Sequence, residues 1–227
     1  MTDLPQLGLY RRATVLALVL APALFLIDNL LHPKEYERGN EARQLAEIAG
    51  HADRWQLAHA IGFLSILVFA AAVLGLAFLV RRRQPRLGLW GGALGICGLL
   101  GLAAAITIDG YTWGMLGEVY QRRGIAPATV EQALHDVQHS GWSLVYYLPP
   151  VAWIFGVAML ALGAARQGAV PPWAGALLAL GALMAGIETA VVSNAYFIAS
   201  SVVLLAGGAA VALAIARLGD SGFARGG

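Results

Sequence analysis

Six long apolar runs dominate this sequence and limit what it can fold into. Each run holds about 20 residues, which is long enough for a helix to cross roughly 30 Å of hydrocarbon. Of the 227 residues, 59% are hydrophobic and only 12% are charged, which lies outside the range of ordinary soluble domains. We therefore predict an all-α integral membrane protein, a single polytopic domain over residues 1–227 with a bundle of about six transmembrane helices. The predicted spans are 13–31, 57–80, 87–108, 142–165, 173–192 and 195–216.

The last two spans are separated by only Ser193 and Asn194. A long bent helix and a re-entrant hairpin over residues 173–216 are therefore alternatives to two separate spans. The first span follows Arg11 and Arg12 but lacks a good small-residue cleavage site, so we expect it to be retained rather than removed as a secretory signal.

The distribution of arginine predicts how the chain is oriented. Short segments between spans, such as 81–86, are rich in arginine, whereas acidic residues outweigh basic ones in the two long segments 32–56 and 109–141. Because cytoplasmic loops carry the excess of Lys and Arg, we predict a protein of the cell (inner) membrane with both termini cytoplasmic and the long segments facing outward. The net charge of +2 reflects this bias, so nucleic-acid binding is not expected.

Both long outer segments show helical patterns. Residues 40–49 form an amphipathic pattern that begins at a good cap, Asn40, and is followed by Gly50, so we expect a short helix lying flat on the outer surface. In the second segment, residues 112–123 continue the third span as a helix until Gly124, and a new helix is expected from near Thr129 into the fourth span.

The third span is rich in glycine, at positions 91, 92, 95, 98 and 101. Small residues three or four positions apart let membrane helices approach closely. The pattern favours tight helix packing, either within the chain or in a homo- or hetero-oligomer. The alternative is a flat face for a planar cofactor.

Polar residues within or beside the spans gather at one depth. Asp28 and His32 are four residues apart and share one face of the first helix. Placing a carboxylate or imidazole toward lipid costs several kcal/mol, so such residues normally turn inward and pair. The outer-leaflet set is Asp28, His32, His59, Asp109, His139 and Glu188. We therefore expect a polar site in the outer leaflet.

A divalent transition metal such as zinc is the first interpretation of this set. His135 and His139 present two imidazoles from one helix, and His59 supplies a third. Asp109 is expected as a further ligand, and Asp109 and Glu188 as the catalytic or orienting carboxylates. Such an ion could activate water against a small or lipid-like substrate.

Three alternatives remain open from the sequence. His59 and His139 could be the two axial ligands of a b-type haem in an electron-transfer protein. The set could be a structural hydrogen-bonded network or a proton-linked solute site. The chain could also be a non-catalytic subunit of a larger membrane complex. Because there is no Gly-x-Ser-x-Gly elbow, phosphate loop or Cys-x-x-Cys, the sequence leaves open whether the protein is an enzyme.

Overall fold

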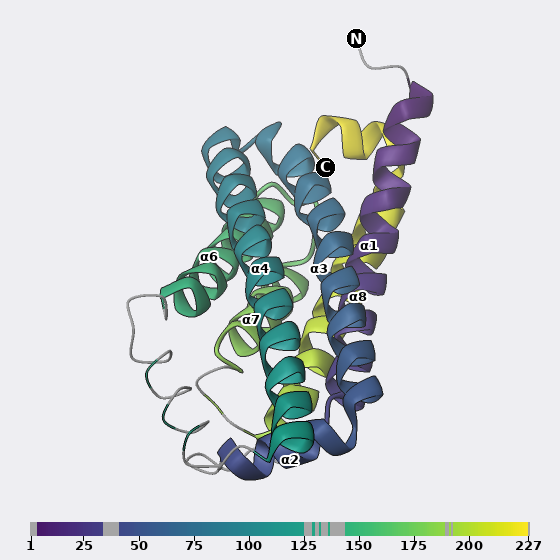
Figure 1. The fold of residues 1–227 in the computed structure, drawn as a ribbon. Coiled ribbons are helices and arrows are strands. Elements are labelled where there is room, and N and C mark those ends of the chain that lie inside the picture. Colours follow the sequence, from purple (N-terminus) through teal and green to yellow (C-terminus); the bar gives the residue numbers. More distant parts are fainter. Residues whose placement is uncertain are drawn as a thin grey trace.

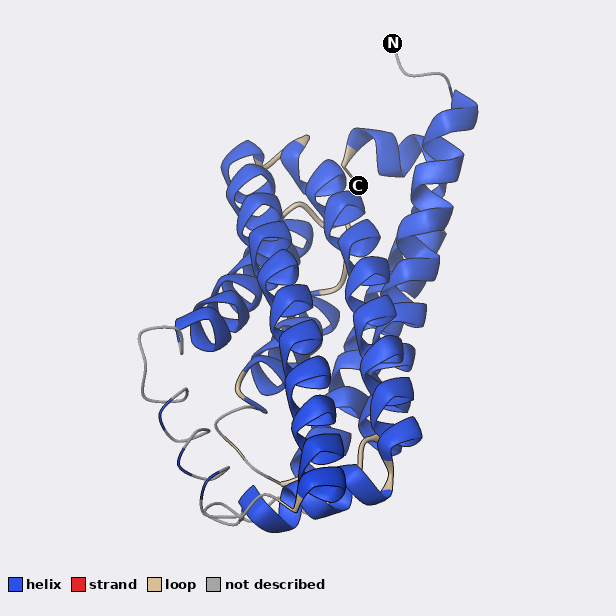
Figure 2. Ribbon diagram, viewed as in Figure 1, coloured by secondary structure: helices blue, strands red, loops and turns tan. Residues whose placement is uncertain are grey.

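Helices make up the regular structure of the chain throughout the described residues. The computed structural model describes residues 4–33, 41–124, 129, 132, 136, 144–188, 191 and 193–226. The helices are α1 (Leu4–Leu31), α2 (Glu41–Gly50), α3 (Ala52–Arg81), α4 (Pro85–Arg123), α6 (Leu144–Arg166), α7 (Pro172–Gly186) and α8 (Asn194–Arg225). The described ranges contain no strand (Figure 2). The predicted all-α class is confirmed for them.

Five helices, α1, α3, α4, α6 and α8, are long and apolar enough to cross a membrane. The sixth apolar helix, α7, has only 15 residues. At 1.5 Å per residue it is about 22 Å long, shorter than the roughly 30 Å hydrocarbon layer. Within the described residues, five helices could therefore span a membrane, which indicates a membrane protein, and the count of six spans stays a prediction.

The two C-terminal apolar runs form separate helices, so the long bent helix is wrong. The run predicted as 173–192 stops being α-helical at Gly186, and Glu188 lies in the connection that follows. The Ser193 hydroxyl then accepts a hydrogen bond from the Tyr196 backbone N–H and caps α8. α7 and α8 pack against each other. Two separate spans and a re-entrant hairpin both stay predictions.

The six apolar helices form a closed ring. In cyclic order, each of α1, α3, α4, α6, α7 and α8 packs against the next, and α8 returns to α1 (Figure 1). The start of α1 and the end of α8 lie at the same end of the bundle, and α2 crosses the opposite end. Arg11 Nε lies 2.8 Å from Asp220 Oδ1 and joins α1 to α8. Which side of a membrane each end faces remains the prediction made above.

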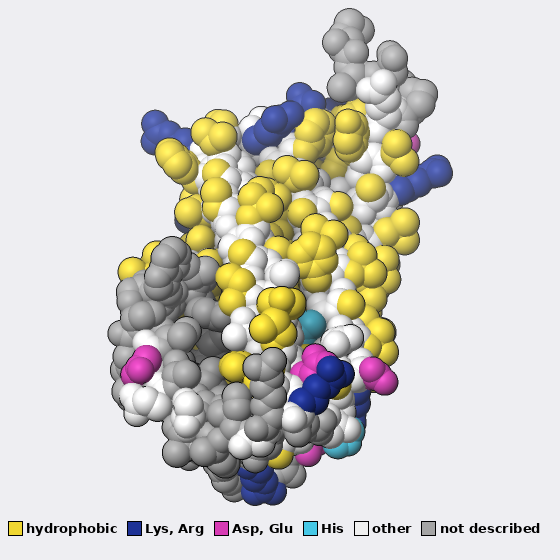
Figure 3. Space-filling model, in the orientation of Figure 1, with side chains coloured by type: hydrophobic (Ala, Val, Ile, Leu, Met, Phe, Trp, Pro, Cys, Tyr) yellow, Lys and Arg dark blue, Asp and Glu magenta, His cyan; other side chains and the backbone are white. Residues whose placement is uncertain are grey.

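The surface matches this arrangement. In Figure 3, hydrophobic side chains cover the middle of the visible face over α3 and α4. Arginine side chains gather at the end that holds the start of α1 and the end of α8, and acidic side chains are found mainly toward the other end. A bundle with an apolar belt and charged ends is suited to a bilayer.

The glycines of the third span pack within the chain. A Cβ added at Gly98 would come within 2.4 Å of the Trp153 backbone nitrogen on α6, and one added at Gly156 would come within 2.3 Å of the Gly95 nitrogen on α4. The interpretation as tight helix packing is confirmed. An oligomer through this span stays a prediction.

The amphipathic helix of the first outer segment is also confirmed. Leu45 and Ile48 of α2 are fully buried, and Leu45 packs against Trp113 and Leu116 of α4. The predicted cap Asn40 lies outside the described residues. As expected, α4 runs on to Arg123, and Gly124 follows with a positive φ of 59°. α2 therefore covers the end of the bundle where α3 begins.

Candidate metal centre

His59 is the central side chain of the candidate site. It lies in the second turn of α3 and is only 8% exposed. Its Nδ1 is 2.9 Å from the Trp55 carbonyl oxygen, four residues earlier. A carbonyl oxygen can only accept, so Nδ1 carries the hydrogen and donates it. In neutral His59, the lone pair is therefore on Nε2.

Asp109, on α4, lies opposite that nitrogen. Its Oδ2 is 3.2 Å from His59 Nε2. A carboxylate oxygen and the lone pair of a neutral imidazole are both acceptors and do not attract each other. A contact of this length therefore calls for a proton between them, carried by Nε2 or by the carboxyl oxygen, or for a metal ion.

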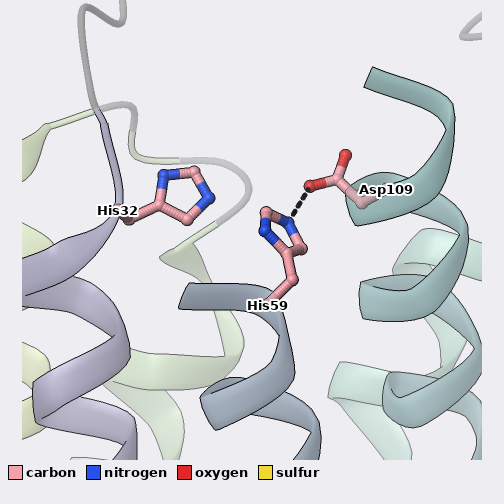
Figure 4. A group of neighbouring side chains, drawn as sticks. All are labelled: His32, His59 and Asp109. Atoms are coloured by element: carbon pink, nitrogen blue, oxygen red, sulfur yellow. Dashed lines mark hydrogen bonds and ion pairs between the residues drawn. The ribbon is translucent and has the colours of Figure 1, made fainter. Parts of the chain in front are cut away.

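His32 brings a second imidazole from a third helix. It directly follows the last residue of α1, and its ring centroid is 5.0 Å from that of His59. His32, His59 and Asp109 can each offer one ligand atom. These three atoms lie within 4.8 Å of one another. Figure 4 shows His59 between the other two side chains. Two nitrogens and one carboxylate oxygen form a donor set found in catalytic zinc and non-haem iron sites.

Neighbouring contacts hold the three helices in place around the site. Arg54 of α3 donates to the carbonyl oxygens of Leu30 and Leu31, at the end of α1 where carbonyls lack helical partners. The Trp55 indole N–H donates to the Gly110 carbonyl oxygen of α4 at 2.9 Å. These bonds join the start of α3 to both neighbouring helices, next to the three candidate ligands.

Asp28 adds a second carboxylate. It is only 5% exposed and lies on α1, four residues before His32. Its carboxylate rests against Gly62, where an added Cβ would come within 2.7 Å of Oδ2, and it interacts electrostatically with His59. When ionised, Asp28 and Asp109 carry two negative charges beside two neutral imidazoles, which a divalent cation would balance.

The structure brings together only part of the set expected from the sequence. His59 and Asp109 meet as expected. Glu188 is not a member of their group; its carboxylate accepts a hydrogen bond from the Ser200 hydroxyl on α8. His135 and His139 lie outside the described residues, so their roles as ligands stay predictions.

His32 is the site residue that sequence reasoning left out of the ligand set. Its signal was the four-residue spacing from Asp28, which placed both on one face of the first helix. The sequence did not show that this face is turned toward α3.

Two openings lead to the histidines. A groove of about 580 Å³ between α3 and α4 has His59 in its wall. A smaller pocket of about 280 Å³ has His32 in its wall, together with Glu47 and Arg54. The pair of imidazoles is therefore reached from two directions.

Comparison with known proteins gives no assignment. No family model matches the chain, and no match is found among curated proteins or among solved structures.

Proposed function

We propose that this chain is a membrane protein that holds a divalent transition-metal ion between His32, His59 and Asp109. The observation that carries the proposal is the 3.2 Å contact between His59 Nε2 and Asp109 Oδ2. Zinc binds imidazole nitrogen and carboxylate oxygen at about 2.0–2.2 Å, so two ligands on one tetrahedral ion stand about 3.4 Å apart. The two atoms are close to that separation.

His32 completes the ligand set after a small movement. The ligand atoms of His32, His59 and Asp109 lie within 4.8 Å of one another. To reach the roughly 3.4 Å that separates two ligands on one tetrahedral ion, the most distant pair must approach by on the order of 1 Å. His32 directly follows the last residue of α1, and its backbone N–H donates to the Asp28 carbonyl oxygen at 2.8 Å, so the movement would have to come from its side chain.

The contacts around the ligands support the same ion. The Nδ1–H bond from His59 to a backbone carbonyl is the usual orienting contact of a metal-bound histidine. Three protein ligands leave a coordination position for water or substrate, so such an ion could polarise a substrate or activate water.

The haem alternative is less well supported by the geometry. A porphyrin iron on His59 Nε2 would have to displace the Asp109 carboxylate, which lies 3.2 Å from that nitrogen. Its second expected ligand, His139, lies outside the described residues. Haem therefore stays an alternative, and an optical absorption spectrum distinguishes it from a single bound metal ion.

Metal titration of the purified full chain tests the proposal. After removal of bound metal with a chelator, the protein in detergent is titrated with Zn²⁺, and with Co²⁺ to read the coordination geometry from its visible spectrum. We expect one ion per chain. We expect His59→Ala and Asp109→Asn to abolish saturable Zn²⁺ binding. Losing a residue that only hydrogen-bonds to a metal ligand typically costs roughly 10- to 100-fold in metal affinity, and we expect His32→Ala to cost more than that.

His51→Ala is the matched control. His51 is exposed, and its Nδ1 is 3.2 Å from Glu47 Oε1 rather than near the other two histidines. The His51→Ala variant should bind Zn²⁺ like the wild type. His139→Ala shows whether the helix expected before the fourth span adds a ligand. A wild-type chain without a saturable site overturns the proposal, and a Soret band in the same sample replaces it with haem.

A further inference from the structure

The larger opening has the size of a ligand site. Its volume of about 580 Å³ falls within the roughly 300–1,000 Å³ of typical ligand clefts. Its lining includes three small residues, Ala60 on α3 and Gly110 and Gly114 on α4. The remaining lining residues are Gln56, His59, Phe63, Ile106, Thr107, Tyr111, Met115 and Glu118.

The groove changes from polar to apolar along its length. α3 and α4 are antiparallel neighbours, so Gln56 and Glu118 belong to the part of the groove nearer α2, whereas Phe63 and Ile106 lie deeper. His59 stands between these two parts. Both walls belong to helices apolar enough to span a membrane. In a bilayer, the deep part of the groove would therefore be open to hydrocarbon.

The smaller opening has the opposite character. It is lined by Asn29, Leu30, His32, Pro33, Glu47, Arg54, Asn194 and Ile198, so most of its lining is polar. Such a pocket suits water. The two histidines, with ring centroids 5.0 Å apart, thus stand between an apolar groove and a polar pocket.

We infer that the groove binds one acyl chain of a membrane phospholipid, with the polar linkage of that lipid beside His59. An amphiphile matches the gradient, because its chain replaces the hydrocarbon in the deep part and its polar end reaches Gln56 and Glu118. A small polar solute would leave the apolar walls without a partner. The inference names the substrate class of the metal centre and rests on that proposed function, although chain binding itself does not require the ion.

Photolabelling tests this inference. The full chain in detergent is titrated with a phospholipid that carries a photoactivatable group in mid-chain, and labelled peptides are mapped by mass spectrometry. We expect saturable labelling of α3 and α4 around Phe63 and Ile106, reduced by unlabelled phospholipid.

Ala60→Trp fills the groove and should weaken this labelling about tenfold, the effect of displacing roughly two methylene groups. Ala199→Trp, at an exposed position of α8 outside the groove, is the matched control and should label like the wild type.

Zn²⁺ content is measured on the same samples. Loss of groove labelling in Ala60→Trp with Zn²⁺ binding retained supports the inference. Labelling spread evenly over all helices, or unchanged in Ala60→Trp, overturns it and leaves the metal centre intact. Groove labelling in a wild type without a metal site supports chain binding and removes the metal proposal alone.

Discussion

Gly110→Ala should damage the metal centre without removing a ligand. Gly110 lies on α4 against His59, and an added Cβ would stand 2.7 Å from both Cγ and Cδ2 of the imidazole. Real Cβ atoms essentially never come this close to another atom, and ordinary van der Waals contact begins at about 3.4 Å. The ring must therefore shift by about 0.7 Å, well beyond the roughly 0.2 Å tolerance of metal–ligand distances.

We expect Gly110→Ala to lower Zn²⁺ affinity because it misplaces the His59 ligand. Substitutions that disturb the residues orienting a metal ligand typically cost 10- to 100-fold in metal affinity, which corresponds to about 1.4–2.7 kcal/mol. The fold should suffer less, because overpacking costs about 1–3 kcal/mol and alanine regains about 1 kcal/mol of helix propensity over glycine. Zn²⁺ affinity by competition titration and thermal unfolding of the metal-free protein separate the two effects.

Gly114→Ala provides the control, one helical turn further along α4. Its added Cβ would meet its nearest neighbour, the Trp55 side chain, at an ordinary 3.6 Å. This variant should bind Zn²⁺ like the wild type. If Gly110→Ala binds Zn²⁺ as tightly as Gly114→Ala, the placement of His59 against α4 is wrong, and the geometric reasoning fails with it.

Two further variants probe the surroundings. Glu188→Gln should leave Zn²⁺ affinity unchanged, because this carboxylate contacts Ser200 on α8; a large loss of affinity would return it to the site. Gly156→Ala should destabilise the bundle by about 1–3 kcal/mol, because its Cβ would meet α4 backbone at 2.3 Å. Gly50→Ala, with nothing within 4 Å, should not destabilise it, and equal melting temperatures for the two alanine variants would contradict tight packing of α4 on α6.

Hydropathy predicted most of the helices but misplaced the end of the fifth apolar run. The fifth run is apolar through Val192, yet α7 stops at Gly186. Beyond it, Glu188 bonds to Ser200, and Ser193 caps the next helix. The Ser193 cap is local and could be read from the sequence, whereas the Glu188 contact crosses to another helix and could not.

The sequence alone also placed the polar side chains at one depth. Depth follows from position along a span, because each residue advances a helix by a fixed 1.5 Å. This was enough to single out His59 and Asp109, which meet at 3.2 Å. It also placed Asp28 and His32 on one face of the first helix.

Only the tertiary structure decided which faces meet. The ring order puts α3 between α1 and α4, so His59 lies between His32 and Asp109, while Glu188 is turned toward α8. That order depends on close helix approaches, such as Gly98 against Trp153, whose partners are distant in sequence. Periodicity specifies how deep a side chain lies and which side of its own helix it occupies; packing between helices decides what stands opposite.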